Sequence, residues 1–170
     1  FVVSWARAAA SSPICLRSQL IGSPSSISPP PARMNWRTSW RRAIENVRPD
    51  ALIVDIQAEG AGYVAEASGL PWAMCCPYPP AFRSVDAPPH GLGLRPARGA
   101  VGRARDRFWF TVGERMLARH VAVRNEVRAG LGLPPLRHFD DHWRQPDRFI
   151  AFTAETYEYP RSDWPASVRL

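Results

Sequence analysis

The sequence predicts an α/β fold built around a parallel β-sheet with helices on both faces. Two apolar runs of strand length, at 51–56 and 70–76, are joined by a segment with helical spacing, and proline or glycine marks the boundaries. Apolar runs without polar alternation suit strands that are covered on both sides, as in parallel sheets. We therefore expect a strand–helix–strand unit over 48–77, with Gly69 ending the helix and a right-handed crossover.

The composition indicates one globular domain whose body is almost neutral. Of the 170 residues, 45% are apolar and 22% charged, which is enough apolar material for a core. The net charge of +7 comes mainly from residues 1–44, which hold six Arg and no acid. Residues 45–170 hold the other sixteen of the 22 basic residues and all 15 acids, so their net charge is only +1. A broad basic face is therefore not expected, and neither is a nucleic-acid partner.

Cysteine usage and hydropathy indicate a cytoplasmic protein. There are three cysteines, two of them adjacent at Cys75 and Cys76, where an ordinary disulfide cannot form, so we expect reduced thiols. No apolar stretch approaches the ~20 residues that cross a bilayer, and stable membrane insertion is not expected.

Two domains of different character are expected. Residues 1–33 are rich in Ser, Ala, Pro and Arg and show no sustained period, so we interpret them as an irregular segment, non-native or disordered. An acid-poor, Arg-rich start is also compatible with a transit peptide. Residues 34–170 are interpreted as the folded domain.

Two further helices are predicted from apolar spacing. The first covers 35–47, where tryptophan and aliphatic residues recur on one face. The second and longest covers 99–130, and its charges are interpreted as a solvated face. Its apolar positions share one face of the helix and are Phe108, Val112, Met116, Val123 and Val127.

The remaining elements are shorter. Residues 148–153 and 168–170 are predicted as strands, and 137–145 as a polar loop. The loop at 82–97, which carries His90 between prolines and glycines, is long enough to suggest a role in ligand contact, although a surface position for His90 is equally ordinary.

Gly60 and Gly62 begin a G-x-G-x-x-A pattern between the first strand and its helix, as in dinucleotide sites. Four residues separate Asp55 from Gly60, where that motif needs a tight turn, and the second strand ends in cysteine and proline where a ribose-binding acid is expected. Close packing of the helix on the strand is the favoured interpretation, and nucleotide binding is the alternative.

His138 and His142 stand at a spacing that zinc sites use on helices. They follow two prolines in a polar stretch, and no third ligand is apparent, so we expect an exposed loop and no metal site.

Asp55 is the acid at the exit of the first strand, and two roles for it remain open. It either caps the following turn or orients a histidine that acts as a catalytic base.

The segments at 48–73 (RPDALIVDIQAEGAGYVAEASGLPWA), 88–96 (PPHGLGLRP), 125–135 (NEVRAGLGLPP) and 152–165 (FTAETYEYPRSDWP) occur in the order and spacing of a known family. The chain resembles the GT-B glycosyltransferases of the UDP-glycosyltransferase superfamily, in particular the bacterial macrolide and natural-product type. The resemblance implies a Rossmann-like domain that forms the N-terminal, acceptor-binding half of a two-domain enzyme.

The resemblance also implies a reaction and its site. A sugar moves with inversion from a nucleotide sugar, such as a UDP- or dTDP-sugar co-substrate, to a hydroxyl of a small, often apolar acceptor, without a metal or other cofactor. Asp55 matches the carboxylate that partners a catalytic histidine. Acceptor contacts are implied for Pro77, Tyr78, Phe82 and His90.

The family's first strand and its Gly-His loop have no counterpart in 1–47, and the donor-binding domain would follow Leu170. We therefore expect this polypeptide alone to be inactive, with a sheet edge or apolar face left open. Two other interpretations stay open: a non-catalytic α/β binding or partner module from a decayed gene, and a fragment of a dinucleotide-binding oxidoreductase.

Overall fold

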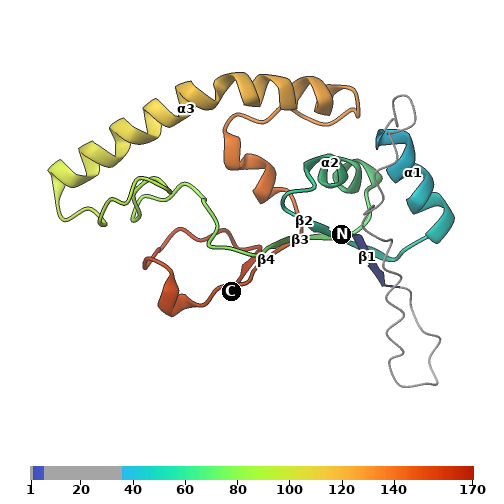
Figure 1. The fold of residues 1–170 in the computed structure, drawn as a ribbon, viewed down its shortest axis with the longest axis horizontal. Helices are drawn as coiled ribbons and strands as arrows, with labels where there is room; N and C mark the ends of the chain where they lie inside the picture. Colours follow the sequence, from blue (N-terminus) through green and yellow to red (C-terminus); the bar gives the residue numbers. More distant parts are fainter. Residues whose placement is uncertain (1, 6–35) are drawn as a thin grey trace, which may run out of the picture.

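The computed structural model describes residues 2–5 and 36–170 of the chain (Figure 1). Five strands form one sheet in the order β1-β2-β3-β4-β5. β1 pairs with β2 antiparallel, and the other neighbours are parallel. The strands are β1 (Val2–Trp5), β2 (Ala51–Asp55), β3 (Trp72–Cys76), β4 (Arg148–Ala151) and β5 (Val168–Arg169). The predicted α/β, Rossmann-like arrangement is confirmed.

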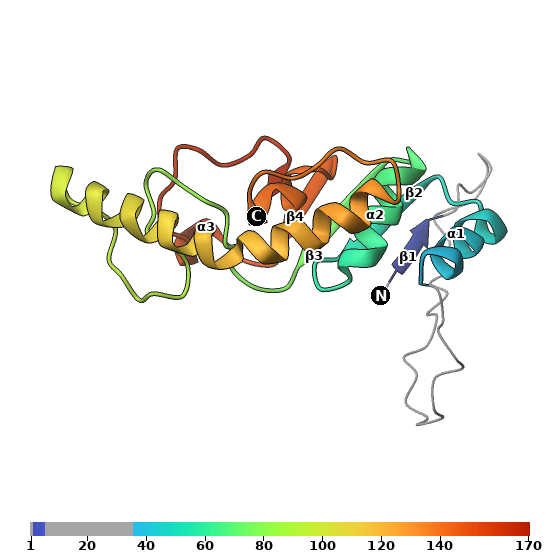
Figure 2. The same ribbon diagram turned by 90° about the horizontal axis from the view of Figure 1, so that it is seen from above.

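Three α-helices and two short 3₁₀ helices complete the described part of the chain. In Figures 1 and 2, α1, α2 and α3 lie on the same side of the sheet. The described α-helices therefore cover one face of the sheet, whereas the sequence predicts helices on both faces. Residues 2–5, in the segment predicted to be irregular, form the strand β1 instead, and the rest of 1–33 lies outside the described residues. The helices are α1 (Trp36–Val47), α2 (Glu59–Ser68), α3 (Ala100–Ala129), η1 (Phe139–Arg144) and η2 (Glu155–Tyr157).

β2 occupies the interior position expected for it, between β1 and β3. Pro49 is buried just before the strand, where its missing N–H costs no ladder bond. Because side chains alternate along a strand, Leu52 and Val54 are buried beneath α2, whereas Ile53 and Asp55 belong to the opposite, half-buried face.

That opposite face is apolar across three strands. The register aligns Ile53 with Ala73 and Asp55 with Cys75, and Cys75 in turn with Ile150 of β4. All these side chains are only partly buried. In the described residues, α2 covers the other face, so this half-buried face is the more open of the two.

Small residues let α2 approach the sheet closely. Ala61 and Ala65 are buried against the core, and the helix ends at Gly69, whose φ of 71° is a left-handed conformation that favours glycine. The Gly69 N–H donates to the carbonyl of Glu66. The strand–helix–strand unit is therefore formed as predicted, with β3 beginning two residues later than expected.

The core beneath α2 continues into an aromatic cluster beside β4. Met74 and Phe149 are fully buried, and the ring of Phe82 meets that of Phe149 edge-on with centroids 4.9 Å apart. Trp143 of η1 packs edge-on against Phe82 at 5.8 Å. This cluster ties the segment after β3 to η1 and to the sheet.

The face of α3 that packs on the rest of the protein carries charged residues, and its apolar face is exposed. The prediction of a solvated charged face is wrong for Arg124 and Arg128, which are buried, while Phe108 and Met116 are exposed. Acids on α2 explain the reversal: Glu66 accepts two hydrogen bonds from the Arg128 guanidinium at 2.6 and 2.7 Å, and Glu59 pairs with Arg124.

The prediction of an exposed polar loop at 137–145 is also wrong. Residues 139–144 form η1, and His142 is fully buried, with its ring centroid 4.5 Å from that of Tyr63. A reciprocal cap starts the helix, because Asp141 accepts the His138 backbone N–H at 2.7 Å. Burial lowers the pKa of His142 to about 3, and the nearby Arg128 and Arg124 charges add to that effect.

The Arg128–Glu66 pair gives a stability prediction. Replacing Arg128 by Met leaves the largely buried carboxylate of Glu66 without its counter-charge, so we expect a loss of about 3–5 kcal/mol in the free energy of unfolding. Urea denaturation measures it. The exposed Arg119→Met change is the matched control and should cost under about 0.5 kcal/mol. Adding Glu66→Leu should recover much of the loss, and a double variant no better than Arg128→Met would contradict this assignment.

The buried His142 gives a pH prediction. Its folded pKa of about 3 lies below the 6.5 of an ordinary histidine, so the unfolded chain binds more protons between these pH values. Its contribution to stability is complete above pH 6.5 and falls by about 1.4 kcal/mol per unit as the pH drops toward 3. Subtracting the denaturation profile of His142→Leu from that of the native sequence isolates this slope, and parallel profiles would disprove it.

Candidate functional site

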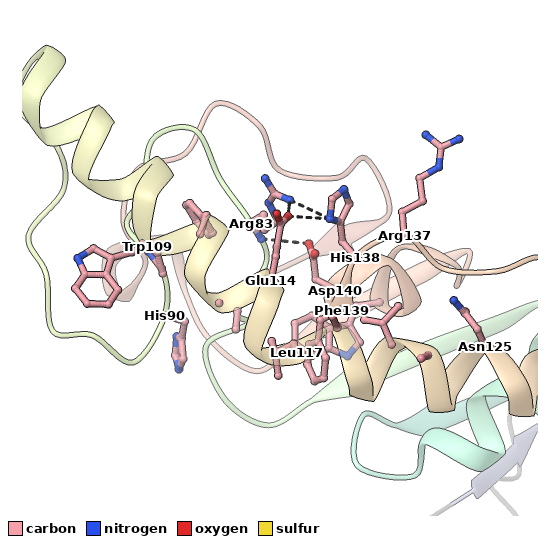
Figure 3. A pocket seen from close by; sticks show the side chains of 18 residues that line it. Arg83, His90, Trp109, Glu114, Leu117, Asn125, Arg137, His138, Phe139 and Asp140 are labelled. Carbon is pink, nitrogen blue, oxygen red and sulfur yellow. Dashed lines mark hydrogen bonds and ion pairs between the residues drawn. The ribbon is translucent and has the colours of Figure 1, made fainter.

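A cleft of about 580 Å³ lies between α3, the segment that follows β3, and η1 (Figure 3). This volume falls in the range of small-molecule sites. Its lining combines apolar and aromatic side chains with polar and charged ones. The lining includes Ala81, Pro89, Trp109, Phe110, Leu117, Val121, Phe139 and Trp143, with Arg83, His90, Glu114, Asn125, Arg137, His138 and Asp140.

The topology places this cleft beyond the carboxyl end of β3. The chain leaves β3 at Cys76 and runs directly into the loop that supplies Ala81 and Arg83 to the cleft. Ligand sites in open α/β sheets gather at that end of the strands. The location therefore agrees with a binding site, independently of the chemistry of its walls.

A polar cluster joins the three walls of the cleft. Glu114 of α3 pairs with Arg83, and its Oε1 lies 2.8 Å from Nδ1 of His138 (Figure 3). The Arg83 backbone N–H donates to Asp140 at 3.2 Å. Because these groups are partly exposed, they offer both donors and acceptors to a ligand.

Buried contacts hold α3 and η1 in place around the cleft. The guanidinium of Arg124 lies 3.7 Å from the ring centroid of Phe139 and donates to that residue's carbonyl at 2.8 Å. Asn125 exchanges two hydrogen bonds with the backbone of Leu136, at 3.0 and 2.8 Å. The rear of the cleft is therefore built on rigid contacts.

Asp55 stands at the carboxyl end of β2 and is not among the residues that line the cleft. Its Oδ1 accepts the backbone N–H of Gln57 at 2.8 Å, which is the turn-capping geometry considered above. No histidine contacts it within residues 2–5 and 36–170. Burial and the Asp55 charge both raise the pKa of the neighbouring Cys75 thiol.

The four residues implied as acceptor contacts take different positions. His90 is exposed and lines the cleft. Pro77 and Tyr78 are exposed directly after β3. Slight desolvation of the Tyr78 hydroxyl, together with the charges of Cys76 and Asp55, raises its pKa. Phe82 is buried within the aromatic cluster. The structure thus brings His90 to the cleft and leaves Tyr78 beside Asp55.

Gly62 serves close packing, but its tight contact is with His142 of η1 and not with the strand, where the favoured interpretation expected it. A Cβ atom at this position would lie 2.8 Å from Nε2 of His142 and 3.7 Å from Cε of Met74. The glycine therefore admits the buried imidazole between α2 and η1.

The histidine pair does not converge on a common point. His142 faces Tyr63 in the interior, whereas His138 is partly exposed and contacts Glu114. Across the described ranges, no group of three His, Cys, Asp or Glu residues is placed to hold a metal ion. None of the described helices is both long enough and apolar enough to span a membrane.

The Arg83–Glu114–His138 cluster is not predictable from the sequence. Arg83 and Glu114 are 31 positions apart, and neither belongs to a recognised motif. Only the helical spacing that places Glu114 on the same face as Leu117 and Val121 connects it to the cleft.

Comparison with known proteins finds a relative that matches most of the chain. No family model matches the chain. The chain is 36% identical over 133 residues to 4'-demethylrebeccamycin synthase of Lentzea aerocolonigenes, a match that covers 75% of this chain and 31% of that protein. The chain is related to a glycosyltransferase. It spans about a third of the length of this curated relative.

A pair of glycines tests the packing at Gly62. Gly62→Ala should lower the free energy of unfolding by about 1–3 kcal/mol, because the added methyl overlaps the His142 ring. Gly113→Ala is the control: it lies within α3 with no atom near its Cβ position, so it should stabilise the fold by about 0.5–1 kcal/mol. Thermal or urea unfolding measures both. Equal effects at the two sites would show that Gly62 is not constrained by His142.

Proposed function

We propose that the chain is the acceptor-binding part of an inverting GT-B glycosyltransferase of the bacterial natural-product type. The observation that carries the proposal is the 36% identity to a glycosyltransferase over most of the chain. A small-molecule cleft at the carboxyl end of β3 supports it independently. The nucleotide sugar would bind through a further domain of the enzyme, in the cytoplasm, and the proposal invokes neither a nucleic acid nor a membrane partner.

The proposed reaction forms one bond and breaks another at the anomeric carbon of the donor sugar. An acceptor hydroxyl loses its proton to a histidine base, and its oxygen attacks as the bond to the nucleotide diphosphate breaks. Asp55 orients that histidine and stabilises the imidazolium that results. Oδ1 of Asp55 accepts the N–H of Gln57, which fixes the carboxylate and leaves Oδ2 for the histidine. No metal or other cofactor is invoked.

The walls of the cleft suit a flat, apolar acceptor. Trp109, Phe110 and Leu117 provide an apolar surface along α3, and His90 lies at the cleft on the loop after β3. The Glu114–His138 pair can exchange hydrogen bonds with acceptor hydroxyls. We propose that an acceptor held there extends a hydroxyl past Tyr78 toward Asp55.

Binding at the cleft is tested by titrating the chain with 4'-demethylrebeccamycin, the compound that the relative's name gives as its product, and following tryptophan fluorescence and calorimetry. We expect saturable binding that Leu117→Asp weakens at least ~10-fold, because a carboxylate in the apolar wall must be desolvated. Thr111→Asp, an exposed site on α3 outside this cleft, is the control and should leave the affinity unchanged. Non-saturable binding, or equal losses in the two variants, would refute the assignment.

The proposal also predicts that the 170-residue chain alone does not transfer sugar. No histidine precedes His90 in the chain, and the donor site is assigned to a further domain of the enzyme, so we expect no product above background with UDP-glucose or a dTDP-sugar and a small apolar hydroxyl compound as acceptor. Chromatographic product analysis checks this. Turnover by the purified chain would contradict the proposed division of roles.

A further inference from the structure

The outward face of α3 carries an apolar stripe that the rest of the described chain does not cover. Val101 is 85% exposed, Phe108 60%, Met116 74% and Val123 53%, and Val112 lies among them half-buried. Figures 1 and 2 show α3 at the border of the molecule with the body behind it. A row of large apolar side chains on one outer face is typical of a contact surface.

The spacing of the stripe is symmetric about Val112. Phe108 and Met116 lie four positions before and after it, and Val101 and Val123 lie eleven positions before and after it. In an antiparallel pair of identical helices, residues at equal distances on either side of the two-fold axis come level with each other. An axis at Val112 therefore sets each apolar residue of the stripe against an apolar residue of the second copy.

We propose that two copies of this chain associate through antiparallel α3 helices, with the two-fold axis at Val112. Val101 of each copy packs on Val123 of the other, Phe108 on Met116, and the two Val112 side chains on each other. This inference is independent of the proposed function, because it uses the face of α3 that points away from the cleft.

The charges that border the stripe fit a second copy. Arg98, just before α3, and Glu126 are both exposed and lie fourteen positions from Val112 in opposite directions, so opposite charges come level at each end. Arg105 comes level with Arg119, but its Nε donates to Asp106 at 2.8 Å and its Nη2 to the Arg95 carbonyl at 2.7 Å. The carboxylate of Asp106 thereby offsets the repulsion between Arg105 of one copy and Arg119 of the other.

The size of the contact predicts a reversible dimer. The stripe from Val101 to Val123 spans about 33 Å of helix. A helix pair of that length buries on the order of 1,000 Å² in total, which lies at the lower end of specific interfaces. The body of each protomer lies behind its own α3, so the sheets do not meet.

Sedimentation equilibrium tests the association. We expect a concentration-dependent monomer–dimer equilibrium that Met116→Glu or Phe108→Glu weakens at least tenfold, since each change sets two carboxylates in the apolar contact. Thr111→Glu, exposed on α3 to the side of the stripe, should leave the dissociation constant unchanged, and circular dichroism verifies that each variant is folded. A chain that stays monomeric at all concentrations would overturn the proposal.

Disulfide trapping tests the position of the axis. In a background with Cys15→Ser, Cys75→Ser and Cys76→Ala, Val112→Cys should cross-link to itself, because it lies on the axis. Phe108→Cys and Met116→Cys should cross-link to each other when mixed, in preference to themselves. Equal trapping of Thr111→Cys would overturn the geometry. A monomeric chain that co-sediments with vesicles of phosphatidylglycerol and phosphatidylcholine, and loses this binding when the stripe is mutated, would also overturn the proposal, because lipid would then be the partner of the stripe.

Discussion

The guanidinium of Arg128 is fully buried, and the position of the long helix depends on how its charge is satisfied. Glu66 takes two of its hydrogen bonds and the carbonyl of Pro134 takes a third, at 2.8 Å. A buried charge without such partners would cost several kcal/mol, so α3 has one favourable register against α2. Arg124, about one turn before Arg128 on α3, pairs with Glu59, about two turns before Glu66 on α2, and extends the same constraint.

This constraint shapes the cleft as well as the fold. Fixing the C-terminal half of α3 on α2 leaves its N-terminal half to extend beyond the sheet, where the loop after β3 meets it (Figure 1). The cleft therefore forms between a helix held at one end and a loop held by the aromatic cluster around Phe82. Its polar cluster crosses that junction, with Arg83 on the loop, Glu114 on the helix and His138 before η1.

Local pattern is sufficient to predict the four parallel strands β2 to β5, but not the antiparallel strand β1 or the packing of α3 and η1. The apolar runs of β2 and β3, the helix between them and its stop at Gly69 follow from composition over a few residues. The buried face of α3 does not, because Arg128 is buried only through an acid 62 positions away. The local pattern likewise predicts a loop position for His142, because the burial of this residue depends on the space that Gly62 leaves on another helix. The prediction that Asp55 has a catalytic role remains a prediction.

Strand alternation has one more effect on Asp55. Its side chain belongs to the sheet face of Ile53 and Cys75, opposite the face that α2 covers. Any layer that packs over Ile53 and Cys75 must also meet the Asp55 carboxylate at the rim of the same surface. A layer that covers this face therefore removes water from the strand and from its terminal carboxylate at the same time.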